Sequence, residues 1–163
     1  MTAEPAELVV RVVGTGHELA RPLFEDLAEE YGTRYGGTPE QIRSELERYP
    51  AVEFEEPHGV LLLLLEDGVA VAGGAYRRYD DTTAELKRIW THPEHRRRGL
   101  ARRVLAELER RAVSAGYARL YLTTGPRQPE AKHLYLTTGY RPLFDVSVDP
   151  ETIGPLAFEK HLP

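Results

Sequence analysis

The sequence has 163 residues, of which 41% are hydrophobic and 29% are charged, and its formal net charge is −5. This length and composition predict one globular domain over residues 1–163 and exclude a disordered chain. The absence of cysteine excludes disulfides, thiolate metal sites and cysteine nucleophiles. The acidic balance argues against nucleic-acid binding. The longest apolar run, Val60 to Leu65, is too short to cross a bilayer, and with no secretory signal in view we expect a cytoplasmic protein without membrane contact.

The first half of the chain predicts two helices and four strands. In chain order, these are a strand at 8–13, helices at 19–31 and 38–49, and strands at 60–65, 69–76 and 84–91. Asp67-Gly68 predicts a two-residue hairpin turn between the strands that flank it. Thr38 to Gln41 has the pattern of a capping box with proline at the first helical position, and Gly14-x-Gly16 is interpreted as a turn.

The second half predicts the most regular helix of the chain. In chain order, the elements are a helix at 100–113, a strand at 119–124, a helix at 129–138, and strands at 140–143 and 156–161. Gly116 and Gly139 stand where the two helices should end. Residues 144–155 are expected to form a loop. The complete order of elements describes one mixed α/β (α+β) sheet flanked by helices.

The segment from His92 to Val104 carries the clearest chemical signal. A strand ends before it, and arginines then surround the start of the next helix at positions 96, 97, 98, 102 and 103. A helix N-terminus presents unpaired N–H groups and a partial positive charge, and Gly99 and Ala101 leave the turn bare enough for a phosphate to approach. The alternative interpretation is an ordinary solvated, arginine-rich helix start.

The pattern Arg96-x-x-Gly99-x-Ala101, placed between a strand and a helix, resembles the acetyl-CoA pyrophosphate loop of the GNAT superfamily of N-acetyltransferases. The resemblance extends through 84–93 and 124–135 and ends at Gly139-Tyr140, so that it covers about residues 84–142. The first third of the chain matches only in the order of its elements. The resemblance implies a mostly antiparallel sheet whose fourth and fifth strands splay apart around acetyl-CoA.

The resemblance also implies roles for individual residues. Backbone groups of the fourth strand should bond the pantetheine arm, and N–H groups of the following turn should hold the pyrophosphate. The implied cofactor-binding residues are Ile89, Trp90, Thr91, Arg96, Arg97, Arg98, Gly99, Leu100, Ala101, Arg102, Gln128 and Ala131. Gln128 stands where the family often has asparagine. Tyr135 matches the family's general acid, which protonates the departing thiolate; without the resemblance it would be interpreted as a core aromatic residue.

Transfer of an acyl group to an amine also requires a group that accepts the amine's proton, and Glu85 is the candidate. It lies eleven residues before Arg96, the spacing at which some histone acetyltransferase-like members of the superfamily carry a glutamate base. Strand alternation places Glu85 on one face with Lys87 and Ile89 unless a bulge intervenes. The alternative is that Glu85 forms a surface ion pair with Lys87 or Arg88.

The predicted function is therefore transfer of an acetyl group from acetyl-CoA to a primary amine of a small molecule or peptide, by direct attack through a tetrahedral intermediate. No metal is expected, because His92 and His95 have no evident third ligand. Acidic residues on loops near the expected acceptor would suit a cationic amine: Asp80, Asp81, Asp145, Asp149 and Glu151. A non-catalytic acyl-CoA-binding sensor and an arginine-mediated nucleic-acid binder remain alternatives. Similar proteins are frequently homodimers, and no motif identifies the acceptor.

Overall fold

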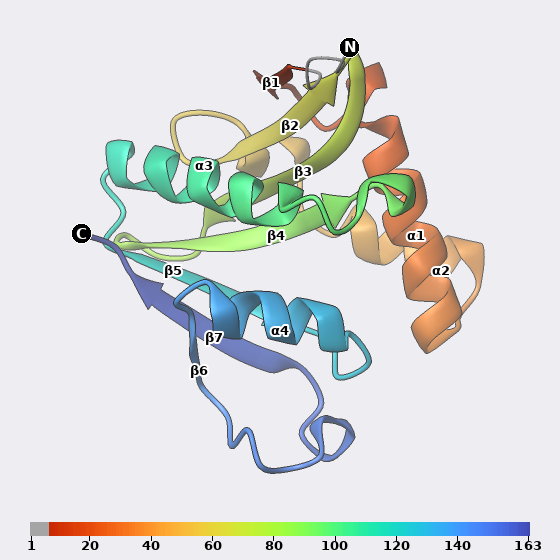
Figure 1. Cartoon of the computed structure of the whole chain (residues 1–163), viewed down its shortest axis with the longest axis vertical. Coiled ribbons are helices and arrows are strands. Elements are labelled where there is room, and N and C mark those ends of the chain that lie inside the picture. Colours follow the sequence, from red (N-terminus) through yellow and green to blue (C-terminus); the bar gives the residue numbers. More distant parts are fainter. Residues whose placement is uncertain (1–6) are drawn as a thin grey trace, which may run out of the picture.

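The computed structural model describes residues 7–163, whose strands form one seven-stranded sheet (Figure 1). The strands are β1 (Leu8–Val12), β2 (Val60–Glu66), β3 (Val69–Arg78), β4 (Thr83–Thr91), β5 (Arg119–Thr124), β6 (Arg141–Pro142) and β7 (Leu156–His161). The helices are α1 (Arg21–Tyr35), α2 (Pro39–Leu46), α3 (Leu100–Ser114) and α4 (Pro129–Thr137). The strand order is β1-β2-β3-β4-β5-β7-β6, and only β4 and β5 are parallel. The expected mostly antiparallel mixed sheet is confirmed.

The sheet separates two hydrophobic cores, one on each face. α3 and α4 cover one face, with Val104, Leu108 and Tyr135 in that core, whereas α1 packs its Leu23 against the other face. The uninterrupted apolar run of β2 follows from this arrangement, because its leucines alternate between the two cores and are fully buried in both.

The turns and the helix cap that the sequence predicted are present in the structure. Asp67 and Gly68 both have positive φ, 52° and 80°, as a two-residue hairpin turn between β2 and β3 requires. The Thr38 hydroxyl accepts a hydrogen bond from the Gln41 backbone N–H at 3.1 Å, and the Gln41 side chain completes the capping box of α2. The prediction of a turn at Gly14-x-Gly16 is also confirmed.

Three predicted boundaries were wrong. A 3-10 turn at Glu18–Ala20 precedes α1, and α2 ends at Leu46, ahead of a second 3-10 turn at Ala51–Phe54. The end of α1 at Tyr35, by contrast, is where Gly36-Gly37 predicts it. The strand predicted at 140–143 is shorter in the structure, where β6 covers only Arg141–Pro142. The Tyr140 N–H does not join the sheet, because it donates to the Tyr135 carbonyl at the end of α4, at 3.1 Å.

β4 and β5 separate, as expected. Their pairing covers only three positions, from Thr83 opposite Arg119 to Glu85 opposite Tyr121. The rest of β4 has no partner on this side, and in Figure 1 the two strands lie together near the C-terminus and diverge toward α1 and the start of α4. Backbone groups along the second half of β4 therefore remain available to a ligand.

A bulge in β4 changes which side chains share a face. Lys87 lies opposite Ala75 and Trp90 opposite Gly73, so β4 has one extra residue there, and Arg88 takes a positive φ of 59°. Ile89 consequently packs into the core beneath α3, whereas Glu85 and Lys87 lie on the opposite face, beside Tyr49. The bulge is the exception that the prediction allowed: Lys87 keeps the face of Glu85, and the bulge moves Ile89 to the other face.

Candidate active site

The separation of β4 and β5 opens a cleft of about 630 Å³, lined by the second half of β4, the turn before α3, the first turns of α4 and two residues of α1. The structure brings twelve of the sequence-predicted site residues together in its wall: Ile89, Trp90, Thr91, Arg96, Arg97, Gly99, Leu100, Ala101, Arg102, Gln128, Ala131 and Tyr135. Two predicted residues, Glu85 and Arg98, do not line it.

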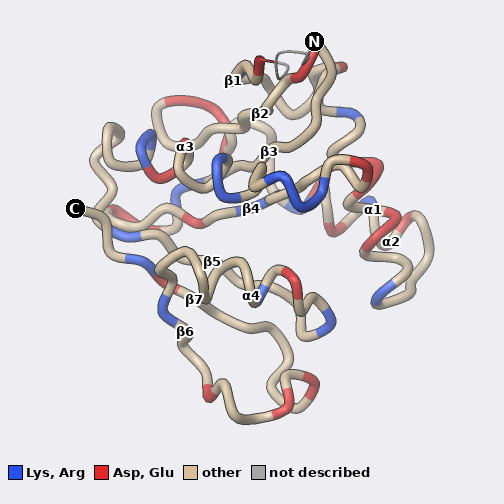
Figure 2. The backbone as a smooth tube through the Cα atoms, viewed as in Figure 1, with Lys and Arg blue, Asp and Glu red and all other residues tan. Residues whose placement is uncertain are grey.

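One end of the cleft is the bare N-terminus of α3. Gly99 caps this helix in the left-handed conformation with φ 73°, and no side chain bonds to the N–H groups of the first turn. A β-carbon at Gly99 would meet no atom within 4 Å, so the space that faces this residue is open. Unpaired N–H groups, the helix dipole and the arginines around the turn (Figure 2) are the features that favour binding of an anion.

The arginines of this turn have different partners. Arg96 lies 3.8 Å from the Glu30 carboxylate of α1, and Arg102 donates to the Thr137 hydroxyl of α4 at 2.9 Å. Arg98 turns away from the cleft and pairs with Glu66 at the end of β2. Arg96 and Arg102 therefore connect the turn before α3 to the α1 and α4 walls of the cleft, whereas Arg98 stabilises the hairpin of β2 and β3.

The α4 wall supplies a buried phenol. Tyr135 is 5% exposed, and its ring packs against Tyr140 and Phe158 with centroid separations of 5.5 and 5.4 Å. Burial raises the pKa of Tyr135 well above its ordinary value, so its hydroxyl stays protonated at neutral pH. Gln128 also lines the wall, but its side-chain oxygen accepts from the Gly125 N–H at 3.0 Å and so holds the turn between β5 and α4.

Glu85 belongs to an ion-pair cluster beside the cleft. Its carboxylate, 6% exposed, accepts from Arg77 at 2.9 Å and lies 3.5 Å from Lys87. Arg77 also donates to Glu53 at 2.7 Å and stacks over the ring of Tyr49 at 4.4 Å. The structure thus pairs Glu85 with Lys87, as the alternative interpretation expected, but in a buried place and with Arg77 instead of Arg88 as the second cation.

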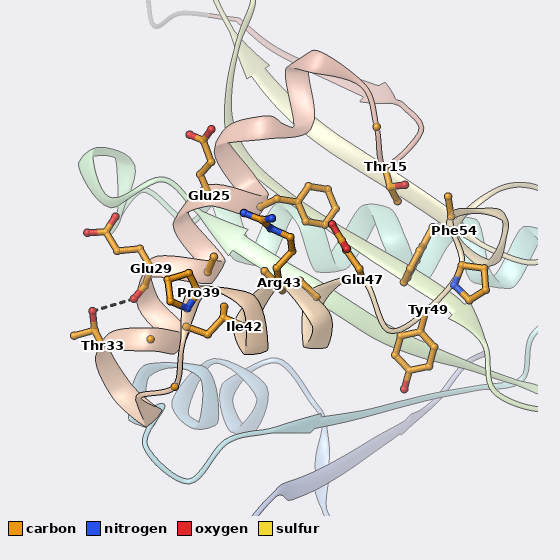
Figure 3. Close-up of a pocket in the computed structure, with 18 residues that line it drawn as sticks. Thr15, Glu25, Glu29, Thr33, Pro39, Ile42, Arg43, Glu47, Tyr49 and Phe54 are labelled. Atoms are coloured by element: carbon orange, nitrogen blue, oxygen red, sulfur yellow. Dashed lines mark hydrogen bonds between the residues drawn. The ribbon is translucent and has the colours of Figure 1, made fainter.

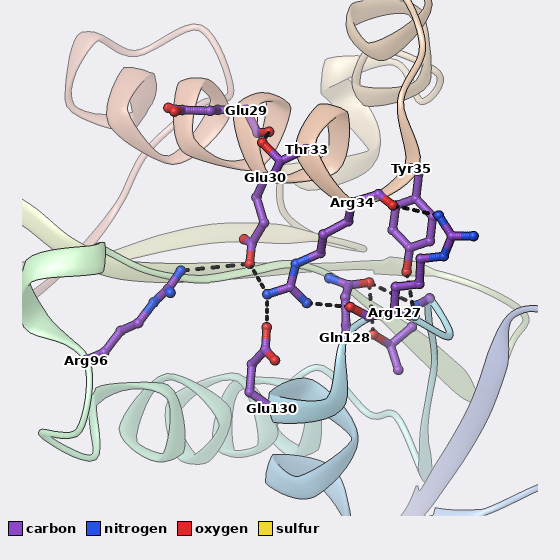
Figure 4. A network of polar contacts seen from close by, with 11 residues as sticks. Glu29, Glu30, Thr33, Arg34, Tyr35, Arg96, Arg127, Gln128 and Glu130 are labelled. Atoms are coloured by element: carbon purple, nitrogen blue, oxygen red, sulfur yellow. Dashed lines mark hydrogen bonds and ion pairs between the residues drawn. The ribbon is translucent and has the colours of Figure 1, made fainter. Parts of the chain in front are cut away.

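A polar bridge that the sequence did not reveal spans the mouth of the cleft (Figure 4). Arg34 of α1 pairs with Glu30 at 2.9 Å, pairs with Glu130 of α4 and donates to the Arg127 carbonyl at 2.8 Å. The Tyr35 hydroxyl accepts from the Arg127 N–H at 3.0 Å. The spacing of Glu30 and Arg34 on one helix face was visible in the sequence, but nothing there indicated that α4 would lie opposite.

The acidic residues expected to attract a cationic acceptor are engaged locally. Asp80 accepts from Thr82, and Asp81 pairs with Arg78. In the loop before β7, Asp145 accepts from Ser147 and Asp149 from the Glu151 N–H, and Glu151 itself pairs with Arg127 at 2.9 Å. These contacts stabilise turns, and of these residues only Asp81 and Glu151 are paired with a cation.

A second pocket of about 970 Å³ lies between α1, α2 and the 3-10 turn at Ala51–Phe54 (Figure 3). Ile42, Tyr49 and Phe54 line it together with polar residues, and none of the sequence-predicted site residues is among its lining. Within residues 7–163, no cluster of three or more His, Asp or Glu side chains has the arrangement of a metal site. No helix in that range is both long and apolar enough to span a membrane.

Comparisons with known proteins agree with this geometry. The model of the acetyltransferase (GNAT) family matches residues 20–140. The uncharacterized N-acetyltransferase YsnE of Bacillus subtilis (strain 168) is 33% identical over 93 residues, which are 53% of this chain and 62% of that protein, so the match spans less than two thirds of the relative.

Solved structures share the fold over nearly the whole chain. The PaiA N-acetyltransferase of Thermoplasma acidophilum, in complex with coenzyme A, aligns with a TM-score of 0.72 and 18% identity over 95% of this chain and 99% of its own. A GNAT family acetyltransferase of Elizabethkingia anophelis with acetyl-CoA bound aligns with a TM-score of 0.65 and 16% identity, over 95% and 98% of the two chains.

Proposed function

The chain belongs to the acetyltransferase (GNAT) family, and we propose that it transfers the acetyl group of acetyl-CoA to a primary amine by direct attack of the amine on the thioester. The observation that carries the proposal is the cleft between β4 and β5, which runs from unpaired strand backbone to the bare N-terminus of α3. Two solved structures of this fold hold coenzyme A or acetyl-CoA.

The residues that line the cleft fit this co-substrate. The N–H groups of Leu100, Ala101 and Arg102, free of intrahelical partners, would bind the pyrophosphate, and Arg96 and Arg97 would add positive charge. The open space in front of Gly99 leaves room for phosphate oxygens close to the backbone. Backbone groups of Ile89, Trp90 and Thr91 would hold the pantetheine arm, while the Trp90 side chain itself is anchored elsewhere, donating to Asp26 at 3.0 Å.

Tyr135 is the proposed general acid. Its hydroxyl makes no hydrogen bond to another described residue, and its ring is fixed by two aromatic neighbours. A phenol that remains protonated can donate to the sulfur as negative charge develops there, which lowers the energy of the departing thiolate.

Glu85 is the proposed acceptor of the amine's proton. It lies on the α1/α2 face of β4, four residues before Ile89, and pairs with Arg77 and Lys87. Since Glu85 does not line the cleft, an ordered water would carry the proton from the amine to its carboxylate.

Turnover of acetyl-CoA with a panel of primary amines, followed by release of free thiol and by mass spectrometry of the product, tests the proposal. We expect thiol release that depends on the amine, together with an N-acetylated product. Tight binding of acetyl-CoA with no turnover for any amine would instead identify a non-catalytic binding module.

A further inference from the structure

One cation on the α1/α2 face of β3 and β4 has no carboxylate partner. Arg77 bonds two carboxylates, and Lys87 lies 3.5 Å from Glu85. Arg88, the next residue, makes no ion pair with any residue of 7–163, and its Nη2 donates instead to the Leu46 carbonyl at the end of α2, at 2.6 Å. The face therefore carries one guanidinium with no carboxylate of residues 7–163 at ion-pair distance.

The Arg88 guanidinium is also largely withdrawn from water. Burial lowers the pKa of Arg88, and the negative charge of Glu45 offsets only part of this effect. Glu45 is turned toward Arg48, 3.6 Å away. A desolvated cation without a counter-charge is unfavourable, and its remaining N–H donors can still bind an oxyanion.

The position of Arg88 connects this charge to the reaction. The β4 bulge leaves both Lys87 and Arg88 on the α1/α2 face, and it places the next residue, Ile89, beneath α3. The α3 face is filled, since Ile89 packs there against Val104 and Leu108. The α1/α2 face is the side of the β4 backbone that an amine can approach, and Arg88 lies there, one residue from Ile89.

We propose that Arg88 determines specificity by binding an anionic group of the acceptor, so that the substrates are amines with a carboxylate or phosphate near the reacting nitrogen. Amino acids are the simplest members of this class. This inference rests on the proposed acetyl transfer. The guanidinium gains its missing counter-charge when the acceptor binds, and a bidentate contact would orient the amine toward the thioester.

Matched amines test the proposal. Each amino acid is compared with its carboxamide, and phosphoethanolamine with ethanolamine, in acetyl-CoA turnover by the wild-type protein. We expect kcat/KM to be at least about tenfold higher for the anionic member of each pair, because the neutral member lacks the charge-assisted contact with Arg88. The pair with the larger difference identifies the preferred anion as carboxylate or phosphate. Equal or better turnover of the neutral members overturns the inference while leaving acetyl transfer intact.

Substitutions of Arg88 test whether this residue causes the preference for anionic acceptors. Arg88→Gln should raise KM for the anionic acceptor about tenfold or more and leave kcat/KM for its neutral partner nearly unchanged, and Arg88→Lys should retain part of the preference. Arg48→Gln removes an exposed cation nearby and serves as the matched control. If Arg88→Gln lowers turnover of both acceptors equally, Arg88 has only a structural role.

A binding measurement separates this inference from the proposed function. Calorimetric titration of the protein saturated with coenzyme A should show binding of the anionic acceptor that Arg88→Gln weakens. If no amine is acetylated but this binding persists, acetyl transfer fails and the anion site stands. If amines are acetylated but the titrations of wild type and Arg88→Gln coincide, the anion site fails.

Discussion

Arg96 Nη2 lies 3.8 Å from Glu30 Oε1, and this ion pair joins the turn before α3 to α1 across the mouth of the cleft. Arg34 extends the contact to Glu130 of α4 (Figure 4), so both walls of the cleft are connected through a few exposed or half-exposed charges. An incoming pyrophosphate would compete with Glu30 for Arg96.

Replacing Glu30 with Gln should therefore tighten coenzyme A binding by about two- to fivefold, the size of a partly exposed ion pair. Calorimetry at low and high salt measures the effect, which should shrink as ionic strength rises. Glu29→Gln removes a neighbouring α1 carboxylate for which the structure gives no ion pair, and is the control. Weaker binding in Glu30→Gln would mean that the bridge instead preorganises the cleft.

Gly99→Val should abolish measurable coenzyme A binding. The β-carbon would enter the open space in front of the turn, and a branched residue at φ 73° is strained. Gly116→Val is the matched control, since Gly116 follows the other end of α3 with φ 94° and equally open space. Both variants should lose comparable thermal stability, but only Gly99→Val should lose binding; unchanged calorimetric affinity in that variant would refute the phosphate turn.

Tyr135→Phe should lower kcat by about a hundredfold or more, within the range of general acid catalysis, and barely change the affinity for acetyl-CoA. The ring and its packing against Tyr140 and Phe158 are retained, so only the hydroxyl is lost. Steady-state kinetics and calorimetry measure the two quantities. An equal loss in both, or no loss, would remove the catalytic assignment.

Glu85→Gln should lower kcat, because an amide cannot accept the proton that the amine loses; steady-state kinetics with a saturating amine measures the effect. Glu53→Gln is the control: it removes the other carboxylate that pairs with Arg77 and is not assigned a catalytic role. If the two variants lose the same stability and the same activity, the Glu85 carboxylate serves only to neutralise its cations.

Alkaline pH should destabilise the protein through its buried phenols. Burial raises the pKa of Tyr76 from 10.0 to about 12, so above pH 10 the unfolded chain releases a proton that the folded chain retains. The stabilisation from this group is complete below pH 10 and is lost as pH rises toward 12. Denaturant unfolding between pH 9 and pH 12 should show a smaller decline for Tyr76→Phe than for wild type. Identical slopes would show that Tyr76 does not contribute.

Contacts between residues close in the chain could be predicted from the sequence. The Asp67-Gly68 hairpin and the Thr38 capping box depend only on backbone preferences over a few residues. The turn from Arg96 to Ala101 is equally local, because the first N–H groups of any helix lack partners and glycine admits the left-handed conformation. The order of elements was sufficient to predict one mixed sheet, whereas the separation of β4 from β5 was expected only from the family resemblance.

Only the tertiary structure decided which side chains meet across the cleft. Periodicity cannot reveal the bulge at Arg88, since the extra residue is fixed by pairing with β3, and that bulge alone separates Ile89 from the face of Glu85. The partners of Glu85 and the bridge from Arg34 to Glu130 join segments far apart in the chain, and their distances follow from how helices and strands pack. The sequence specified which chemical groups the site contains, and the packing of helices and strands determined which residues the charged groups pair with.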